Sequence, residues 1–182
     1  MCPFMSARLL WDLTRNRLSN ALGRPETVHA HCDIPCGIYD PHEAQISALT
    51  VLRMDQLIGE LPKPSTTSKP EEIEAYQAKL ARYMAVKESH AERVKSELRV
   101  IWGDYFTPDH VKQHPGLHES FFQAMKLASK ARQGTNLADA QALVAAVQGI
   151  AEVFWKTKGA TTRKLPSLQK SGGEIVYPVP PS

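Results

Sequence analysis

Apolar residues recur every three or four positions through most of the chain between residues 40 and 160, which is the spacing of an amphipathic helix. The first such stretch ends at Pro62, and its apolar positions are Ile46, Leu49, Met54, Leu57 and Leu61. The residues before it, Asp40, Pro41 and Glu43, have the order of a helix N-cap, a proline at the first helical position and a capping-box acid. The pattern therefore predicts a helix from about residue 41 to 61.

Three further helices are predicted by the same spacing. The longest follows Pro70 and ends near Trp102-Gly103, with apolar positions Ile73, Tyr76, Leu80, Tyr83, Ala91, Val94, Leu98 and Ile101. The next ends at Gly134 and carries Leu117, Phe121, Met125 and Ala128. The last starts at Asn136 as its N-cap, ends before Gly159, and carries Leu143, Val147, Ile150, Phe154 and Trp155. Four amphipathic helices with short links predict an all-α fold, an antiparallel up-down-up-down four-helix bundle.

The segment after Ala160 has a different composition. Its prolines and glycines, which interrupt a helix, are Pro166, Gly172, Gly173, Pro178, Pro180 and Pro181. We expect residues 161–182 to be a flexible C-terminal extension that buries little surface. An alternative is that Ile175-Val176-Tyr177 forms an edge strand or a peptide for a partner.

The net charge of +3 lies at the two ends of the chain, because residues 1–30 and 161–182 each hold an excess of basic residues over acidic ones. The region between them is close to neutral. We therefore expect no nucleic-acid partner. No apolar run approaches the length of a transmembrane span, so we also expect a soluble protein without membrane association.

The candidate chemistry is concentrated between His31 and Pro41, in the run HCDIPCGIYDP. Two of the three cysteines, Cys32 and Cys36, lie here beside His31, in a segment that a proline and a glycine allow to turn. By itself, a pair of cysteines three residues apart is more often a reduced pair, half of a zinc site or a redox switch. No second Cys or His pair with suitable spacing follows that could complete a tetrahedral zinc site.

The run resembles the amino terminus of mature nickel superoxide dismutases, at His31, Cys32, Asp33, Pro35, Cys36, Gly37, Tyr39, Asp40 and Pro41. Trp102-Gly-Asp-Tyr-Phe106 and Phe154-Trp155-Lys-Thr-Lys158 are similar to later landmarks of that family. The resemblance covers residues 31 to about 160. It implies a catalytic domain over 31–160, in which an irregular N-terminal metal-binding hook precedes the bundle. It also implies a nickel-dependent superoxide dismutase that converts superoxide to dioxygen and hydrogen peroxide by Ni(II)/Ni(III) cycling.

The same resemblance implies the roles of the hook residues. His31, through its amine and imidazole, Cys32, through its amide and thiolate, and the thiolate of Cys36 are the expected ligands of a nickel ion. If the chain is cut before His31, two nitrogens and two sulfurs form a square that suits Ni(II), and the imidazole can take an axial position for Ni(III). Tyr39 and Asp33 are the expected catalytic residues beside the metal, with Tyr39 controlling the open face and ordering water. The alternatives are a packed aromatic for Tyr39 and a turn cap for Asp33.

Residues 1–30 are interpreted as a removable leader peptide. The apolar run Leu9-Leu10-Trp11 is interrupted at once by Asp12, which does not fit an export signal. The resemblance implies a leader-cleaving peptidase acting after Ala30, a cytoplasmic location and a homohexamer. An amphipathic helix that belongs to the fold is the alternative for the leader. The alternative functions are a nickel or zinc binding or delivery module without redox catalysis, and a helical scaffold with inert cysteines.

One position pair departs from the family. Its members commonly hydrogen-bond the axial imidazole to a carboxylate on the first helix and an arginine on the second. Counting from the hook, and back from Trp102, places Ser47 and His90 there. We therefore expect the His31 imidazole to be held less strongly by charge, which affects its orientation and the redox potential more than the activity itself.

Overall fold

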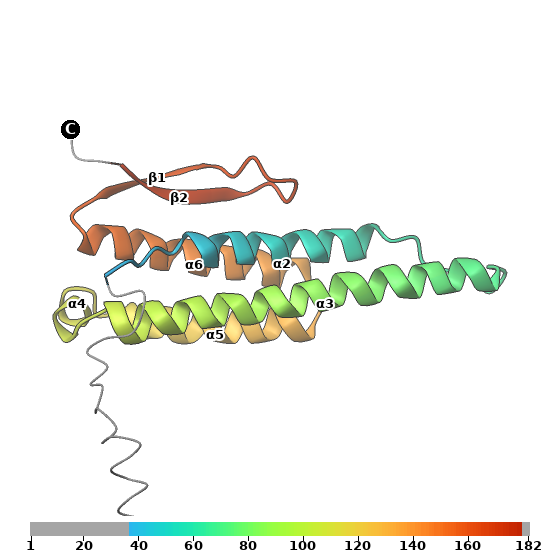
Figure 1. Ribbon diagram of the computed structural model, residues 1–182, viewed down its shortest axis with the longest axis horizontal. Helices are drawn as coiled ribbons and strands as arrows, with labels where there is room; N and C mark the ends of the chain where they lie inside the picture. Colours follow the sequence, from blue (N-terminus) through green and yellow to red (C-terminus); the bar gives the residue numbers. More distant parts are fainter. Residues whose placement is uncertain (1–36, 180–182) are drawn as a thin grey trace, which may run out of the picture. The chain divides into compact units, whose positions relative to one another are not determined.

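The computed structural model describes residues 37–179, and four long helices form its bundle (Figure 1). They are α2 (His42–Glu60), α3 (Pro70–Val100), α5 (Leu117–Gln133) and α6 (Leu137–Thr157). Each packs against the long helix before it, and α6 closes the ring against α2. Their directions alternate along the bundle (Figure 1). The prediction of an antiparallel up-down-up-down four-helix bundle is confirmed.

The core is built from the periodic apolar positions. Among its fully buried members are Ala48, Val51, Ala91, Val94, Leu98, Ala124, Ala128, Leu143, Val147 and Ile150. Alanines at facing positions let the helix backbones approach closely, and the branched residues fill the remaining space. At the start of α6 the side chain of Asn136 accepts a hydrogen bond from the N–H of Ala138 at 3.0 Å, as expected of an N-cap.

The start of α2 differs in detail from the prediction. The carboxylate of Asp40 accepts a hydrogen bond from the N–H of His42, the first helical residue, at 2.7 Å, but Pro41 and not Asp40 occupies the N-cap position. Glu43 does not close a capping box. Its carboxylate accepts a hydrogen bond from Arg93 Nη1 at 2.9 Å instead, which joins α2 to α3.

Two short helical segments that were not predicted connect α3 to α5. A π-helical turn, η1 (Ile101–Tyr105), continues α3, and the N–H of Phe106 bonds to the carbonyl of Ile101 at 3.2 Å. A short helix, α4 (Pro108–Gln113), follows and is capped by Thr107, whose hydroxyl accepts from the N–H of His110. The pair Thr107-Pro108 is the sequence signal that could have predicted it.

The prediction of a flexible extension over 161–182 is wrong for residues 161–179. They form an antiparallel hairpin of β1 (Thr161–Pro166) and β2 (Glu174–Val179). Ile175 and Val176 are 1% and 2% exposed. The side chain of Gln45 on α2 accepts from the N–H of Val176 at 2.8 Å and donates to its carbonyl at 3.1 Å. The alternative of a strand at residues 175–177 is thus the correct one, because these residues bury their side chains on the bundle.

Within residues 37–179, one ion pair lies in the core. The side chains of Lys87 on α3 and Asp55 on α2 are both 0% exposed, and Lys87 Nζ donates to Asp55 Oδ1 at 3.0 Å. The same ammonium donates to the carbonyl of Gly134, in the turn between α5 and α6. Burial raises the pKa of the Asp55 carboxyl, although the hydrogen bond from Lys87 acts in the opposite direction. The pair therefore links three parts of the bundle.

Among the described residues, α6 is the helix that is long and apolar enough to cross a membrane by length and composition, which differs from our expectation that no run approaches a span. Its apolar side chains include Leu143, Val147, Ile150 and Phe154, which are buried in the bundle. The core of a helical bundle requires a helix of this composition.

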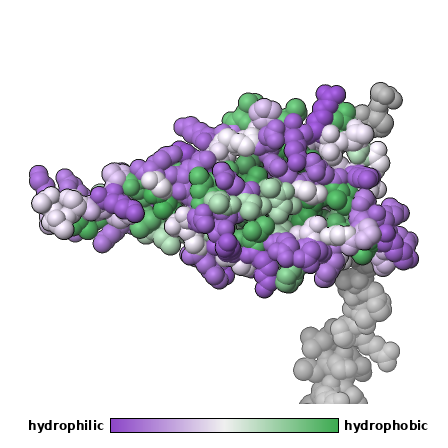
Figure 2. Space-filling model, turned by 180° about the vertical axis from the view of Figure 1, so that it is seen from behind, coloured by the Kyte–Doolittle hydropathy of each residue, from purple (hydrophilic) through white to green (hydrophobic). Residues whose placement is uncertain are grey.

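The bundle has two dissimilar ends. At one end α3, together with the loop 61–69, extends past α5 and α6 (Figure 1). Figure 2 shows this part from behind as a narrow projection with a mostly hydrophilic visible surface. The opposite end carries the start of the described chain, α4 and the last turn of α6 (Figure 1). Residues 37–40 therefore enter the bundle at the end where the aromatic residues gather.

Candidate functional site

The structure describes residues 37–40, which join the hook to α2 and are called the hook exit below, but it does not describe the predicted metal-binding residues. His31, Cys32, Asp33 and Cys36 lie outside the described residues, so their predicted roles are not tested by it. The described chain begins at Gly37, whose φ of 81° is in the region that favours glycine.

Tyr39 is half-buried at the end of the bundle. Its ring lies 5.8 Å from the ring of Tyr105, tilted by 55°. Its carbonyl oxygen accepts a hydrogen bond from Lys158 Nζ at 3.3 Å. Tyr39 therefore packs against the bundle, and its role beside the metal stays a prediction.

Tyr105 is the centre of an aromatic cluster that sequence analysis did not predict as part of the site. Its hydroxyl is hydrogen-bonded to the hydroxyl of Thr157 at 2.8 Å. Its ring lies 4.4 Å from Phe154, 5.1 Å from Phe106 and 5.6 Å from the stacked imidazole of His110. The cluster thus joins the two sequence landmarks at 102–106 and 154–158, which are some fifty positions apart along the chain.

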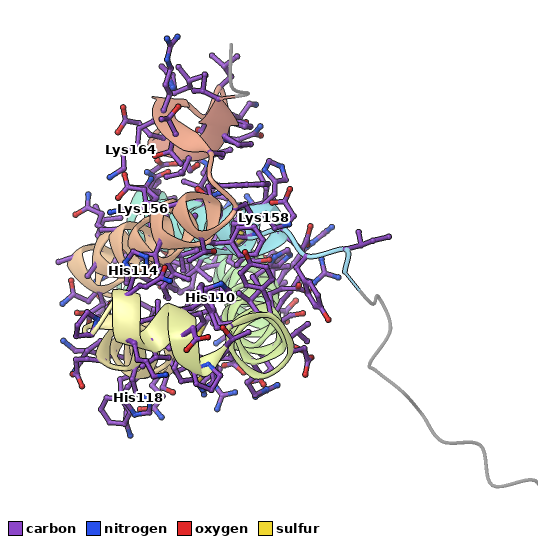
Figure 3. All side chains as sticks on the ribbon, turned by 90° about the vertical axis from the view of Figure 1, so that its left-hand side faces the viewer. His110, His114, His118, Lys156, Lys158 and Lys164 are labelled. Carbon is purple, nitrogen blue, oxygen red and sulfur yellow. The ribbon has the colours of Figure 1, made fainter. Side chains whose placement is uncertain are left out.

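Lys158 is the second residue of this region that sequence analysis missed. Its ammonium lies 4.7 Å from the ring centroid of Phe154, 5.4 Å from Tyr105 and 5.6 Å from Trp155. Figure 3 looks onto this end of the bundle and shows Lys158 beside the segment that enters α2. The sequence signal that included this lysine was the family landmark at 154–158. The helical spacing of apolar residues did not indicate a role for it.

Ser47 and His90 lie on neighbouring helices, α2 and α3. Each is about one helical turn along its helix from a member of the Glu43–Arg93 ion pair. The hydroxyl of Ser47 and the Nδ1 atom of His90 are buried and have no hydrogen-bond partner within residues 37–179. Burial lowers the pKa of His90, Arg93 lowers it further, and Glu43 opposes the shift. The imidazole is therefore biased toward its neutral form. An unpaired buried polar group costs about 1–3 kcal/mol.

The bundle itself offers no alternative metal site in its described part. Within residues 37–179 no group of three or more His, Cys, Asp or Glu side chains could hold a metal ion. The three cysteines, Cys2, Cys32 and Cys36, all precede Gly37. A thiolate-bound metal in this chain must therefore take its sulfur ligands from the segment before the bundle.

Comparisons with known proteins give one consistent result. Residues 26–158 match the family described as nickel-containing superoxide dismutase. A Superoxide dismutase [Ni] from Streptomyces seoulensis is 34% identical over 152 residues, which cover 79% of this chain and 99% of that protein. Its counterpart from Streptomyces coelicolor is 32% identical over 143 residues, with the same coverage of both proteins.

Solved structures agree with the sequence comparisons. A nickel-containing superoxide dismutase after partial X-ray-induced reduction has a TM-score of 0.60 and 34% identity, and the match covers 71% of this chain and all of that one. A native nickel superoxide dismutase has a TM-score of 0.58 and 32% identity, with 70% and 99% coverage. The family match ends at residue 158, so the hairpin over 161–179 lies beyond it.

Proposed function

This chain belongs to the nickel-containing superoxide dismutase family, and from this membership we propose that His31, Cys32 and Cys36 hold its nickel ion. Its activity is superoxide dismutation, the conversion of superoxide to dioxygen and hydrogen peroxide with nickel as cofactor. A binding or delivery module without redox catalysis is not favoured, because its relatives are enzymes.

The location of the thiols is the observation that carries the ligand assignment. The family match starts at residue 26 and thus includes both Cys32 and Cys36, whereas the described bundle contains no cysteine. Thiolates beside an imidazole and backbone nitrogens are soft donors that suit a first-row metal of square-planar preference. When bound, nickel supplies the one-electron chemistry that alternately oxidises and reduces superoxide.

Side chains near the metal would control access to it and supply protons. We assign Tyr39 to the control of access and to the ordering of water, because its ring is held at the hook exit by Tyr105. Asp33 is assigned a supporting role within the hook. A substrate as small as superoxide needs a proton supply and the exclusion of larger ligands more than a shaped pocket.

Ser47 and His90 are proposed to lie near the His31 imidazole, at the places where relatives have charged partners. Two buried polar atoms, Ser47 Oγ and His90 Nδ1, have no hydrogen-bond partner within residues 37–179, which supports this assignment. Because neither residue carries a full charge there, His90→Ala should change activity modestly, whereas His31→Ala should remove most of it. Equal losses at constant nickel loading would show that His90 is an essential partner.

The assembly and processing of the chain are proposed from the same membership. We propose a cytoplasmic homohexamer, and a peptidase that removes residues 1–30 so that His31 has a free amine. We propose no membrane or nucleic-acid partner, since the apolar side of α6 is used in the core and the basic excess lies in the two ends.

Native mass spectrometry of the purified protein tests these assignments together. We expect each chain to begin at His31 and to hold one nickel ion. Cys32→Ser and Cys36→Ser should each lose nickel and dismutation while the helical circular dichroism remains, and Cys2→Ser should change neither. A Cys32→Ser protein that keeps nickel and activity would refute the ligand set.

A further inference from the structure

Lys158 lies between the hook exit and the aromatic cluster, at the end of α6. Its ammonium donates to the Tyr39 carbonyl at 3.3 Å and lies within 6 Å of three ring centroids. A cation is attracted to the faces of aromatic rings, and the attraction increases when water is partly excluded. The Lys158 side chain is thus held by the Tyr39 carbonyl and by the aromatic rings.

The end of α6 fixes the backbone from which this side chain projects. Gly159 has a φ of 74°, and the N–H of Ala160 bonds to the carbonyl of Trp155 at 3.0 Å, which closes the last turn of the helix. The hairpin that follows is itself fixed on the bundle by the bonds between Gln45 and Val176. Lys158 therefore projects from a well-anchored position toward the segment that enters α2 (Figure 3).

We propose that Lys158 is a positioning residue for the hook: by holding the Tyr39 backbone against α6, it fixes the point at which the metal-binding segment joins the bundle. A charged N–H donor makes a stronger bond to a carbonyl than a neutral donor does. The proposal rests on the assignment of the nickel ligands to the hook, but the contact itself can be tested without metal.

Attraction of superoxide by positive charge is the competing explanation for a lysine here. Lys156 offers a matched control, since it lies two residues earlier at the same end of the bundle (Figure 3). It is exposed and forms no ion pair, ring contact or side-chain hydrogen bond within residues 37–179. A role in charge alone would be shared by the two lysines, whereas a positioning role belongs to Lys158.

The first test uses the metal-free chain that begins at His31. Amide hydrogen exchange of residues 42–45, in which the N–H of His42 bonds to the Asp40 carboxylate and the N–H of Gln45 bonds to the Pro41 carbonyl, is compared in the unsubstituted protein, Lys158→Met, Lys158→Arg and Lys156→Met. We expect exchange to accelerate about five- to tenfold in Lys158→Met, to stay unchanged in Lys156→Met, and to be largely restored in Lys158→Arg. Exchange in the core of α6 should not change. Equal exchange in all four proteins, or acceleration that extends through α6, would overturn the proposal.

The second test measures nickel(II) affinity by competition with a chelator. We expect Lys158→Met to bind nickel about tenfold more weakly, and Lys156→Met to bind it as the unsubstituted chain does. Equal weakening by both substitutions would show that the effect does not depend on the Lys158–Tyr39 contact and would overturn the positioning role. Should the unsubstituted chain bind no nickel, the ligand assignment fails, while the exchange experiment still decides the Lys158–Tyr39 contact.

Discussion

Lys87 and His90 lie three residues apart on α3, and their buried polar atoms differ in whether they have hydrogen-bond partners. Lys87 keeps partners, the carboxylate of Asp55 and the carbonyl of Gly134, whereas His90 Nδ1 has none within residues 37–179. A buried charge must be paired, and a buried imidazole can instead remain neutral. Helical spacing predicted neither arrangement, because a pattern of apolar positions does not show which polar residues share a face with them.

The stability of the bundle should depend on pH through His90. Its pKa in the folded protein is lowered from 6.5, so on acidification the unfolded chain binds a proton before the folded chain does. The stabilisation is complete above pH 6.5 and is lost as the pH falls through the folded pKa. We expect urea unfolding of the metal-free protein to show a smaller loss between pH 7 and pH 5 in His90→Gln. Identical losses in the two proteins would show that His90 does not titrate in this way.

Removal of one member of the buried ion pair should be costly. Lys87→Met leaves the Asp55 carboxylate buried without its partner and should lower the free energy of unfolding by about 3–5 kcal/mol. The double variant Lys87→Met with Asp55→Leu should recover most of this loss, because no charge is then buried. Urea unfolding measures both. A double variant as unstable as Lys87→Met would place the cause in packing and not in the unpaired charge.

At the scale of elements, the helices follow from local pattern and the hairpin does not. The four long helices repeat their core positions within a few residues, so the sequence alone predicts them. The hairpin depends on contacts between Gln45 and Val176, which are 131 positions apart. Its glycines were interpreted as residues that interrupt a helix. They form part of the turn between β1 and β2 instead, since Gly172 and Gly173 have φ of 69° and 77°.

Part of the site, like part of the fold, could be predicted from the sequence. His31, Cys32 and Cys36 were assigned from a run of residue types that resembles a known hook, and the structure does not describe them. Tyr105 and Lys158 reach Tyr39 only because η1 and the end of α6 bring distant segments together. No local spacing signals that meeting.

Loss of the Gln45 side chain should loosen the hairpin. Gln45→Ala leaves the N–H and carbonyl of Val176 without their partners, at a cost of about 1–3 kcal/mol. Thermal unfolding and limited proteolysis of residues 161–179 report the change. Gln141→Ala, at an exposed position on α6, is the control and should stay within about 0.5 kcal/mol. Unchanged proteolysis in Gln45→Ala would show that other contacts hold the hairpin.

At the scale of the whole molecule, processing should switch the enzyme on. In the full-length chain the nitrogen of His31 is an amide, so it cannot supply the amine of the proposed ligand set. We expect protein that begins at Met1 to lack dismutase activity even with nickel present, and protein that begins at His31 to be active. Superoxide dismutation at equal nickel concentration compares them. Equal rates would refute the requirement for a free amine.

The hairpin also returns the chain to the end where the described residues begin. The strand β2 ends at the end of the bundle where α2 starts (Figure 1), and the ring of Tyr177 is 6.0 Å from that of His42 at the start of α2. An affinity tag or fusion partner attached after β2 would therefore lie at the end of the bundle that carries Tyr39. The loop 61–69 is the better attachment point. Molecules coupled to an electrode or resin through a single reactive group introduced at Thr66, an exposed position, would all present the end of the bundle that carries Tyr39 away from the support.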